Sequence, residues 1–90
     1  MAKVKFTSAL KPFFPELRDL ELEGATIREL LAQADSRYPG IANYLTDETG
    51  SLRKHVNIFL QGDLIKDRST LSDPVRKSDE LLIFQALSGG

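Results

Sequence analysis

The chain has 90 residues, a length that fits one domain with a single hydrophobic core. Its 12 basic and 13 acidic residues give a net charge of −1, which argues against a general nucleic-acid-binding protein, because such proteins carry a basic excess. Cysteine is absent, so disulfides, thiolate metal sites and a cysteine nucleophile are excluded. We find neither a signal-peptide core nor a run long enough to span a membrane, and we therefore expect a cytoplasmic protein that does not bind membranes.

Two early stretches, residues 3–8 and 19–23, alternate polar and apolar side chains, which is the period of a half-buried strand. We expect them to pair as an antiparallel hairpin through a short connection. The apolar positions that would face inward are Val4, Phe6, Leu20 and Leu22. Between the strands, Pro12 and Pro15 flank two phenylalanines and cannot donate to a sheet, so this segment predicts a turn whose rings, Phe13 and Phe14, pack under the sheet.

A helix is predicted after Gly24. Thr26 and Glu29 fit a capping box, in which the threonine side chain accepts from the amide of Glu29 and the Glu29 carboxylate accepts from the amide of Thr26. One apolar stripe follows at helical spacing: Ile27, Leu30, Leu31, Ala34 and Tyr38. The sequence Pro39-Gly40 ends this helix, and residues 41–45 could add one more helical turn packed on the sheet.

The second half predicts three more strands. Residues 56–60 form the first, and the turn Gln61-Gly62-Asp63 leads to a short return strand at Leu64-Ile65. Residues 66–78 are mostly polar, with Leu71 and Val75 as hydrophobic anchors. The closing strand is predicted at residues 81–87, and it leads directly into Ser88-Gly89-Gly90.

This order of elements predicts an α+β fold in which one main helix covers a mixed sheet. A first hairpin, one crossover helix and a late strand that pairs in parallel with the first strand are typical of the β-grasp (ubiquitin-like) arrangement. We therefore predict a β-grasp domain over residues 1–87 and a flexible Ser-Gly-Gly tail over residues 88–90.

The fold order, the length and the ending Leu87-Ser88-Gly89-Gly90 resemble the ubiquitin-like sulfur carriers, a family that includes the MoaD, ThiS and CysO types. The resemblance covers nearly the whole chain and is strongest in residues 38–41, 56–59 and 83–90. The segment from residue 38 to residue 58 is most similar to the CysO type, whereas ThiS-type carriers are usually shorter there. Gln85-Ala86 replaces the paired prolines common in MoaD-type chains, and Ser88 replaces the alanine of the common CysO ending, so the pathway stays open.

The resemblance implies a carrier that is not an enzyme, binds no cofactor itself and is a monomer when free. The carboxylate of Gly90 would be adenylated with ATP by a ubiquitin-activating-type adenylyltransferase (MoeB- or ThiF-like) and then become a thiocarboxylate. The sulfur acceptor would be a cysteine-synthase-type enzyme, favoured slightly by the middle segment, or the large subunit of molybdopterin synthase. Gly89, Ser88 and Leu87 would thread the partner's channel, which suits glycines because they lack a Cβ.

Strand alternation also predicts where such a partner would dock. If Leu81 and Ile83 face the helix, Leu82 and Phe84 face the opposite side of the sheet. Phe59 points the same way if its neighbours in the third strand are core residues. Since the third and last strands are adjacent in this fold, Phe59, Leu82 and Phe84 would form one exposed apolar patch beside the tail, which is typical of an interface.

Other polar residues are weaker candidates for a site. The single histidine, His55, is interpreted as structural, and the acidic residues lie in predicted turns without the spacing of a calcium loop, so no metal site is predicted. Two alternatives to the sulfur carrier remain: a ubiquitin-like modifier joined to lysine amines through Gly90, and a non-covalent ubiquitin-like binding module.

Overall fold

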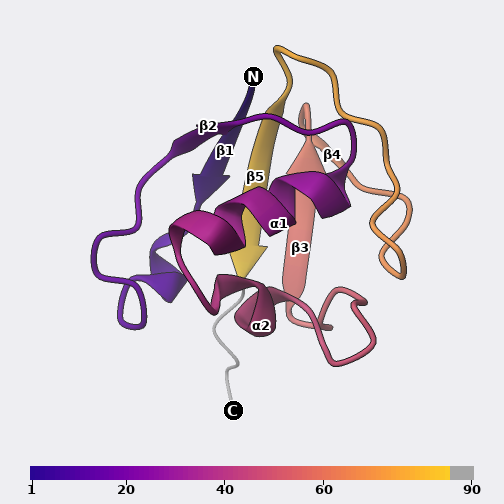
Figure 1. The fold of residues 1–90 in the computed structure, drawn as a ribbon. Helices are drawn as coiled ribbons and strands as arrows, with labels where there is room; N and C mark the ends of the chain where they lie inside the picture. Colours follow the sequence, from indigo (N-terminus) through magenta and orange to yellow (C-terminus); the bar gives the residue numbers. More distant parts are fainter. Residues whose placement is uncertain (86–90) are drawn as a thin grey trace.

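The computed structural model describes residues 1–85, which form one five-stranded mixed sheet with two α-helices and a 3-10 helix. The strands lie in the order β2-β1-β5-β3-β4 (Figure 1). In chain order the elements are β1 (Ala2–Phe6), the 3-10 helix η1 (Ser8–Leu10), β2 (Leu20–Leu22), α1 (Ile27–Arg37), α2 (Ile41–Leu45), β3 (Val56–Leu60), β4 (Asp63–Leu64) and β5 (Glu80–Gln85).

The pairing of the strands confirms the predicted β-grasp order. β1 pairs antiparallel with β2 and parallel with β5, whose other edge pairs antiparallel with β3. The last strand therefore lies at the centre of the sheet, between the first strand and the third. β5, from whose end the tail sequence continues, is therefore held by strand pairing on both edges.

α1 lies across one face of the sheet and buries its apolar stripe there (Figure 1). From the helix, Ile27, Leu30 and Ala34 are fully buried, as are Leu81 and Ile83 of the central strand. Burying each leucine or isoleucine of this set contributes about 1.5–3 kcal/mol, so the contact between α1 and the central strand is a major part of the core. Among residues 1–85 the buried set is entirely hydrophobic, with no polar or charged member.

The beginning of α1 is capped largely as predicted. The hydroxyl of Thr26 accepts from the amide of Glu29 at 3.2 Å. The predicted second half of the capping box is wrong, because the Glu29 carboxylate accepts from the amide of Ala25 at 3.1 Å rather than from that of Thr26. The side chain thus reaches one residue further back, to an amide that lies before the helix.

A tight link joins α1 to α2. Gly40 has a φ of 97°, a left-handed conformation that favours glycine, and it stands directly before α2. The carboxylate of Asp35, near the end of α1, accepts from the amides of Gly40 at 3.1 Å and Ala42 at 3.0 Å. One acidic side chain thereby satisfies amides at the start of the second helix and fixes the angle between the two.

The connection between β1 and β2 differs from the prediction in two ways. It spans residues 7–19, longer than expected, and includes η1, whose Leu10 is fully buried. Phe14 is partly buried against the core, as predicted, but Phe13 does not pack under the sheet and is 55% exposed. Leu10 already fills the position beneath the sheet, which leaves Phe13 on the outside of the turn.

The hairpin of β3 and β4 turns on two residues with positive φ, Gln61 at 52° and Gly62 at 87°, the pattern of a type I′ turn. It makes β4 Asp63–Leu64, one residue earlier than the predicted return strand, while Ile65 is buried. The following loop contributes Leu71 and Val75 to the core, as predicted.

Candidate functional site

The two faces of β5 have opposite character. Leu81 and Ile83 are fully buried beneath α1, whereas Leu82 is partly buried and Phe84 is 42% exposed on the other face. The predicted alternation is therefore confirmed. The central strand of the fold thus presents large apolar side chains on a surface that neither α1 nor α2 covers (Figure 1).

The neighbouring strands extend this surface. Phe59 of β3 lies directly opposite Leu82, and on its other side it lies opposite Leu64 of β4, which is 56% exposed. The structure therefore brings the three predicted patch residues onto one face and adds Leu64. The two-residue turn Gln61-Gly62 fixes this register, and only Gly62 signalled it in the sequence, because glutamine does not favour the positive φ that Gln61 adopts. We call Phe59, Leu64, Leu82 and Phe84 the outer-face patch.

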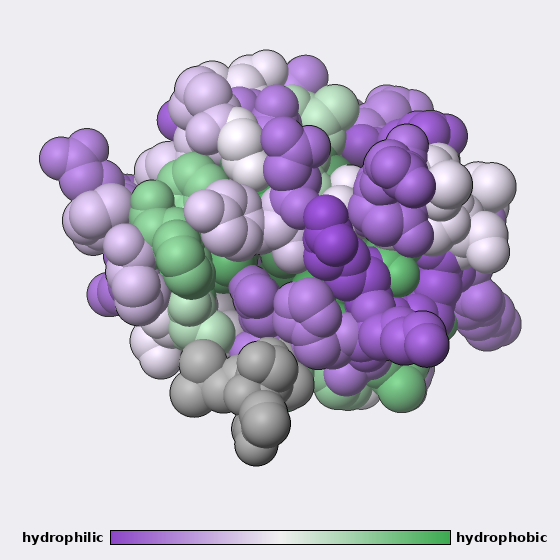
Figure 2. Space-filling view, turned by 90° about the horizontal axis from the view of Figure 1, so that it is seen from below, coloured by the Kyte–Doolittle hydropathy of each residue, from purple (hydrophilic) through white to green (hydrophobic). Residues whose placement is uncertain are grey.

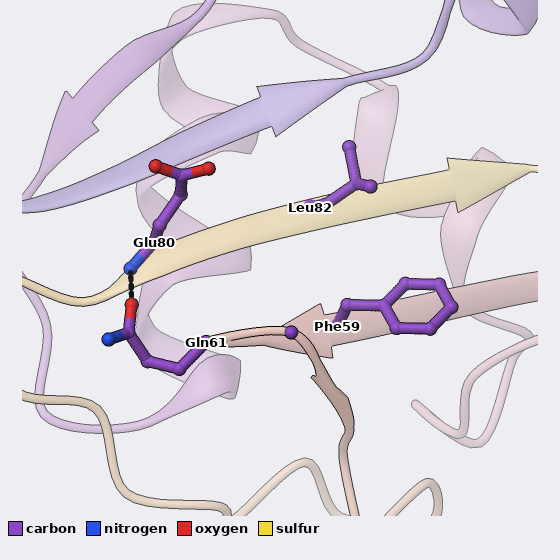
Figure 3. A pocket seen from close by; sticks show the side chains of 5 residues that line it. Phe59, Gln61, Glu80 and Leu82 are labelled. Atoms are coloured by element: carbon purple, nitrogen blue, oxygen red, sulfur yellow. Dashed lines mark hydrogen bonds between the residues drawn. The ribbon is translucent and has the colours of Figure 1, made fainter.

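A shallow open depression of about 550 Å³ lies at one end of the patch. Phe59 and Leu82 form its apolar side, as Figure 3 shows, while Gln61 and Glu80 form its polar side. The Gln61 side chain accepts from the amide of Glu80 at 2.7 Å, and the Glu80 carboxylate pairs with Lys5 at 3.1 Å. This ion pair is half-exposed, so it contributes little to stability.

At the other end of the patch, Phe84 lies opposite Asn57 of β3. The Asn57 side chain accepts from the Arg68 guanidinium at 3.1 Å, and the same guanidinium donates to the carbonyl of Arg53 at 2.7 Å. A fixed positive charge therefore borders the apolar surface near the end of β5.

The predicted reactive residue and tail lie outside the described residues. The structure describes β5 as far as Gln85, so its predicted continuation to Leu87, the threading residues Ser88 and Gly89, the sulfur-bearing Gly90 and the boundary between domain and tail stay predictions. The last described residue is held on both sides: its amide donates to the Thr7 hydroxyl at 3.4 Å, and its side-chain nitrogen lies 3.3 Å from the His55 ring.

Polar clusters elsewhere organise loops. The Ser72 and Thr70 hydroxyls and the Thr70 amide donate to the Asp67 carboxylate and hold its pKa well below the usual 3.8. The Thr49 hydroxyl and amide likewise lower the pKa of Asp47. Within residues 1–85 no group of three potential metal ligands comes together, and no helix there is long and apolar enough to cross a membrane.

Comparisons with known proteins agree with this architecture. The sulfur carrier protein CysO of Mycobacterium tuberculosis is 24% identical over 89 residues, which are 97% of this chain and 96% of that protein. A chain of the Amycolatopsis orientalis BexX/CysO complex is 26% identical, with full coverage of both chains and a TM-score of 0.85. The modifier protein SAMP1 of Haloferax volcanii has the same fold, with 23% identity, a TM-score of 0.77 and coverage of 99% and 98%.

These findings place the chain within a family. The curated relatives are named sulfur carrier proteins, in agreement with the predicted carrier. The family model described as ThiS family matches residues 4–90, nearly the whole chain and including its last two glycines. The predicted resemblance to the ubiquitin-like sulfur carriers is therefore confirmed, and the chain belongs to the ThiS family.

Proposed function

We propose that the chain is a sulfur carrier whose reactive group is the α-carboxylate of Gly90. The observation that carries this proposal is the family match, which runs through the final Gly89-Gly90 pair. The name of the Mycobacterium relative, sulfur carrier protein CysO, supports the same assignment. The fold supports it too, because a central strand leads straight from the core into the tail sequence.

The proposed chemistry has two steps, both performed by partner enzymes. First, a carboxylate oxygen of Gly90, ionised at neutral pH because its pKa is ordinarily about 3.3–3.7, attacks the α-phosphorus of ATP and pyrophosphate leaves. Second, hydrosulfide attacks the carbonyl carbon of this acyl-adenylate and AMP leaves, so that a thiocarboxylate remains. Each step exchanges one leaving group for one nucleophile and requires no redox change in the chain.

Affinity for these enzymes has to come largely from the folded domain. The tail offers few side-chain contacts, and ordering it costs roughly 1–2 kcal/mol per residue in backbone entropy. We propose that the outer-face patch supplies this affinity by docking an adenylyltransferase of the MoeB or ThiF type. That a CysO has been solved in complex with BexX supports the idea that such carriers bind a partner through a surface of their own.

For the acceptor of the sulfur, we propose an enzyme of the cysteine-synthase type. The curated relatives that match over nearly the full length are CysO proteins.

Intact mass spectrometry of the protein purified from its own host tests the proposal. A species heavier by about 16 Da, the difference between sulfur and oxygen, located in the C-terminal peptide would support a thiocarboxylate. Its consistent absence, even with the adenylyltransferase, ATP and sulfide supplied, would contradict the proposal. A ladder of covalent adducts on lysines would instead favour the protein modifier.

A further inference from the structure

A second apolar surface lies on the side of the domain away from the outer-face patch. The Phe13 and Tyr44 rings pack against each other at a tilt of 34° with centroids 4.8 Å apart, and Phe14 meets Tyr44 edge-on at 5.4 Å. Phe13 and Tyr44 are 55% and 37% exposed, whereas Phe14 is partly buried against the core. We call Phe13 and Tyr44 the aromatic pair.

The aromatic pair is held in place. The amides of Phe13 and Phe14 both donate to the carbonyl of Leu10 at 3.0 Å, and Leu10 is fully buried. Tyr44 is carried by α2, whose Ile41 and Leu45 are fully buried. An exposed phenylalanine on such a fixed backbone loses little conformational freedom on binding, which is the property of a preorganised interface anchor.

The aromatic pair lies at the end of the molecule where β5 ends. Thr7, which accepts from the amide of Gln85, directly precedes η1, and Phe13 follows η1 in the same turn. Figure 1 places this turn, α2 and the end of β5 at the same end of the domain. Figure 2 looks onto that end, and its hydrophobic surface gathers on the left, the side where Figure 1 places the connection between β1 and β2.

The length of the remaining chain limits where a partner can be. Residues 86–90 follow Gln85, and five residues span at most about 17 Å even when fully extended. An enzyme that takes the Gly90 carboxylate into its active site must therefore bring its surface to within this distance of the end of β5. The outer-face patch lies on one side of that point and the aromatic pair on the other, so both are within reach of an enzyme surface around the channel entrance.

The activating step has the greatest need for such recognition. The adenylating enzyme meets an ordinary carboxylate on glycines without side chains, whereas a later enzyme meets a thiocarboxylate that marks the carrier chemically. We propose that the aromatic pair is a second docking surface, which contacts an apolar rim around the channel of the adenylating enzyme. This inference rests on the proposed function and extends it to residues on the helix side of the sheet.

A binding titration tests the inference without requiring the chemistry. Because the chain has no cysteine, a Lys77→Cys variant carries one fluorophore at the opposite end of the domain, before β5. Fluorescence anisotropy then reports binding to the adenylyltransferase from the same host. We expect Phe13→Ala and Tyr44→Ala each to raise the Kd about tenfold, as expected for interface anchors, while the exposed control Arg76→Ala leaves it unchanged.

Each outcome decides the inference. The inference would be overturned if Phe13→Ala and Tyr44→Ala both bound the adenylyltransferase as wild type does. It would also be overturned if the adenylyltransferase did not bind the wild-type chain, or if the two variants bound only the sulfur-accepting enzyme more weakly. Unchanged thermal unfolding would show that both variants are folded, and at saturating enzyme both should still gain the sulfur. A wild-type chain that binds the enzyme but never gains the thiocarboxylate mass would instead contradict the proposed function alone.

Discussion

Ile83 and Phe84 are neighbours in the central strand, yet one supports the fold and the other is free for a partner. Ile83 is fully buried, so truncation to alanine leaves a cavity, and we expect Ile83→Ala to lower the free energy of unfolding by about 2–5 kcal/mol. Phe84 is 42% exposed, and Phe84→Ala should cost about 0.5 kcal/mol or less. Urea denaturation of both variants measures this difference.

The same Phe84→Ala variant should bind the adenylyltransferase more weakly than wild type by about tenfold. Glu48→Ala, an exposed change in the polar loop after α2, serves as the control and should bind as wild type does. A Phe84→Ala chain that is stable and binds normally would remove the residue from the docking surface, while a large loss of stability would mean that its ring supports the core.

Some residues of the site could be predicted from the sequence and others could not. Phe59, Leu82 and Phe84 followed from two facts: the burial of one set of side chains in a strand determines the face of the other set, and the third and last strands are adjacent in the predicted fold. Leu64 depended on the register of a hairpin, which is set by the turn rather than by hydrophobicity. The exposure of Phe13 was mispredicted, since an apolar side chain in a proline-flanked turn carries no periodicity that shows which way it points.

At the level of elements, the N-terminal cap of α1 should make a measurable contribution. The Thr26 hydroxyl accepts from the Glu29 amide, an orphan donor of the first turn. We expect Thr26→Ala to lower the free energy of unfolding by about 1 kcal/mol. Ser36→Ala is the matched control, because the exposed Ser36 hydroxyl donates to the carbonyl of Ala32 within the helix and caps nothing. Equal midpoints in urea for the two variants would contradict the role of the cap.

The loop after β4 also caps the start of α1, through its backbone carbonyls. Its carbonyls of Leu71 and Asp73 accept from the first amides of the helix at 2.9 and 3.2 Å. Within the loop, the Asp67 carboxylate accepts from the hydroxyls of Thr70 and Ser72 and from nearby amides. The Asp67 side chain therefore holds the loop whose carbonyls accept from the first amides of α1, although Asp67 itself belongs to no strand or helix.

This arrangement predicts a pH dependence. These hydrogen bonds lower the pKa of folded Asp67 below 3.8, so its stabilising contribution is present above pH 3.8 and is lost as the pH falls through the lower folded value. Asp67→Asn should therefore unfold at lower urea than wild type near neutral pH, and the gap should narrow at about pH 3 and below. A gap that is equal at both pH values would show that the carboxylate charge contributes nothing.

Periodic elements were predicted well, and irregular ones were not. α1 and β3 have a clear hydrophobic period, and both match the prediction to within a residue or two. η1 is three residues long and gave no periodic signal, and β4 was displaced by one residue because Gln61 adopts a positive φ that its sequence does not announce. Local backbone choices of this kind depend on tertiary contacts more than on side-chain pattern.

For the whole molecule, the stretch that most resembled CysO-type carriers proves to have a structural role. Tyr38 is the C-cap residue of α1, and Gly40, in a left-handed conformation, is the N-cap residue of α2. A sequence that builds this corner is selected by the geometry of two packed helices, whatever enzyme receives the sulfur. The fold could therefore be predicted while the acceptor could not, because the residues at this corner are explained by the packing of two helices and carry no information about a partner enzyme.

At the scale of the whole molecule, the proposed function assigns folding to the described residues 1–85 and the chemistry to the Gly90 carboxylate, and changes in tail length test this assignment. Deleting Gly90, or adding one glycine after it, moves the carboxylate by up to about 3.6 Å without touching the core, so both variants should unfold in urea as wild type does. Because misplacement of a reacting group by about 1 Å can cost a hundredfold in rate, each should form thiocarboxylate at least about 100-fold more slowly. The measurement is a time course of intact mass with the adenylyltransferase, ATP and sulfide. The control variant Ser88→Ala keeps the tail length and should react at close to the wild-type rate. A wild-type rate for the chain that lacks Gly90 would show that the domain does not control the position of the carboxylate.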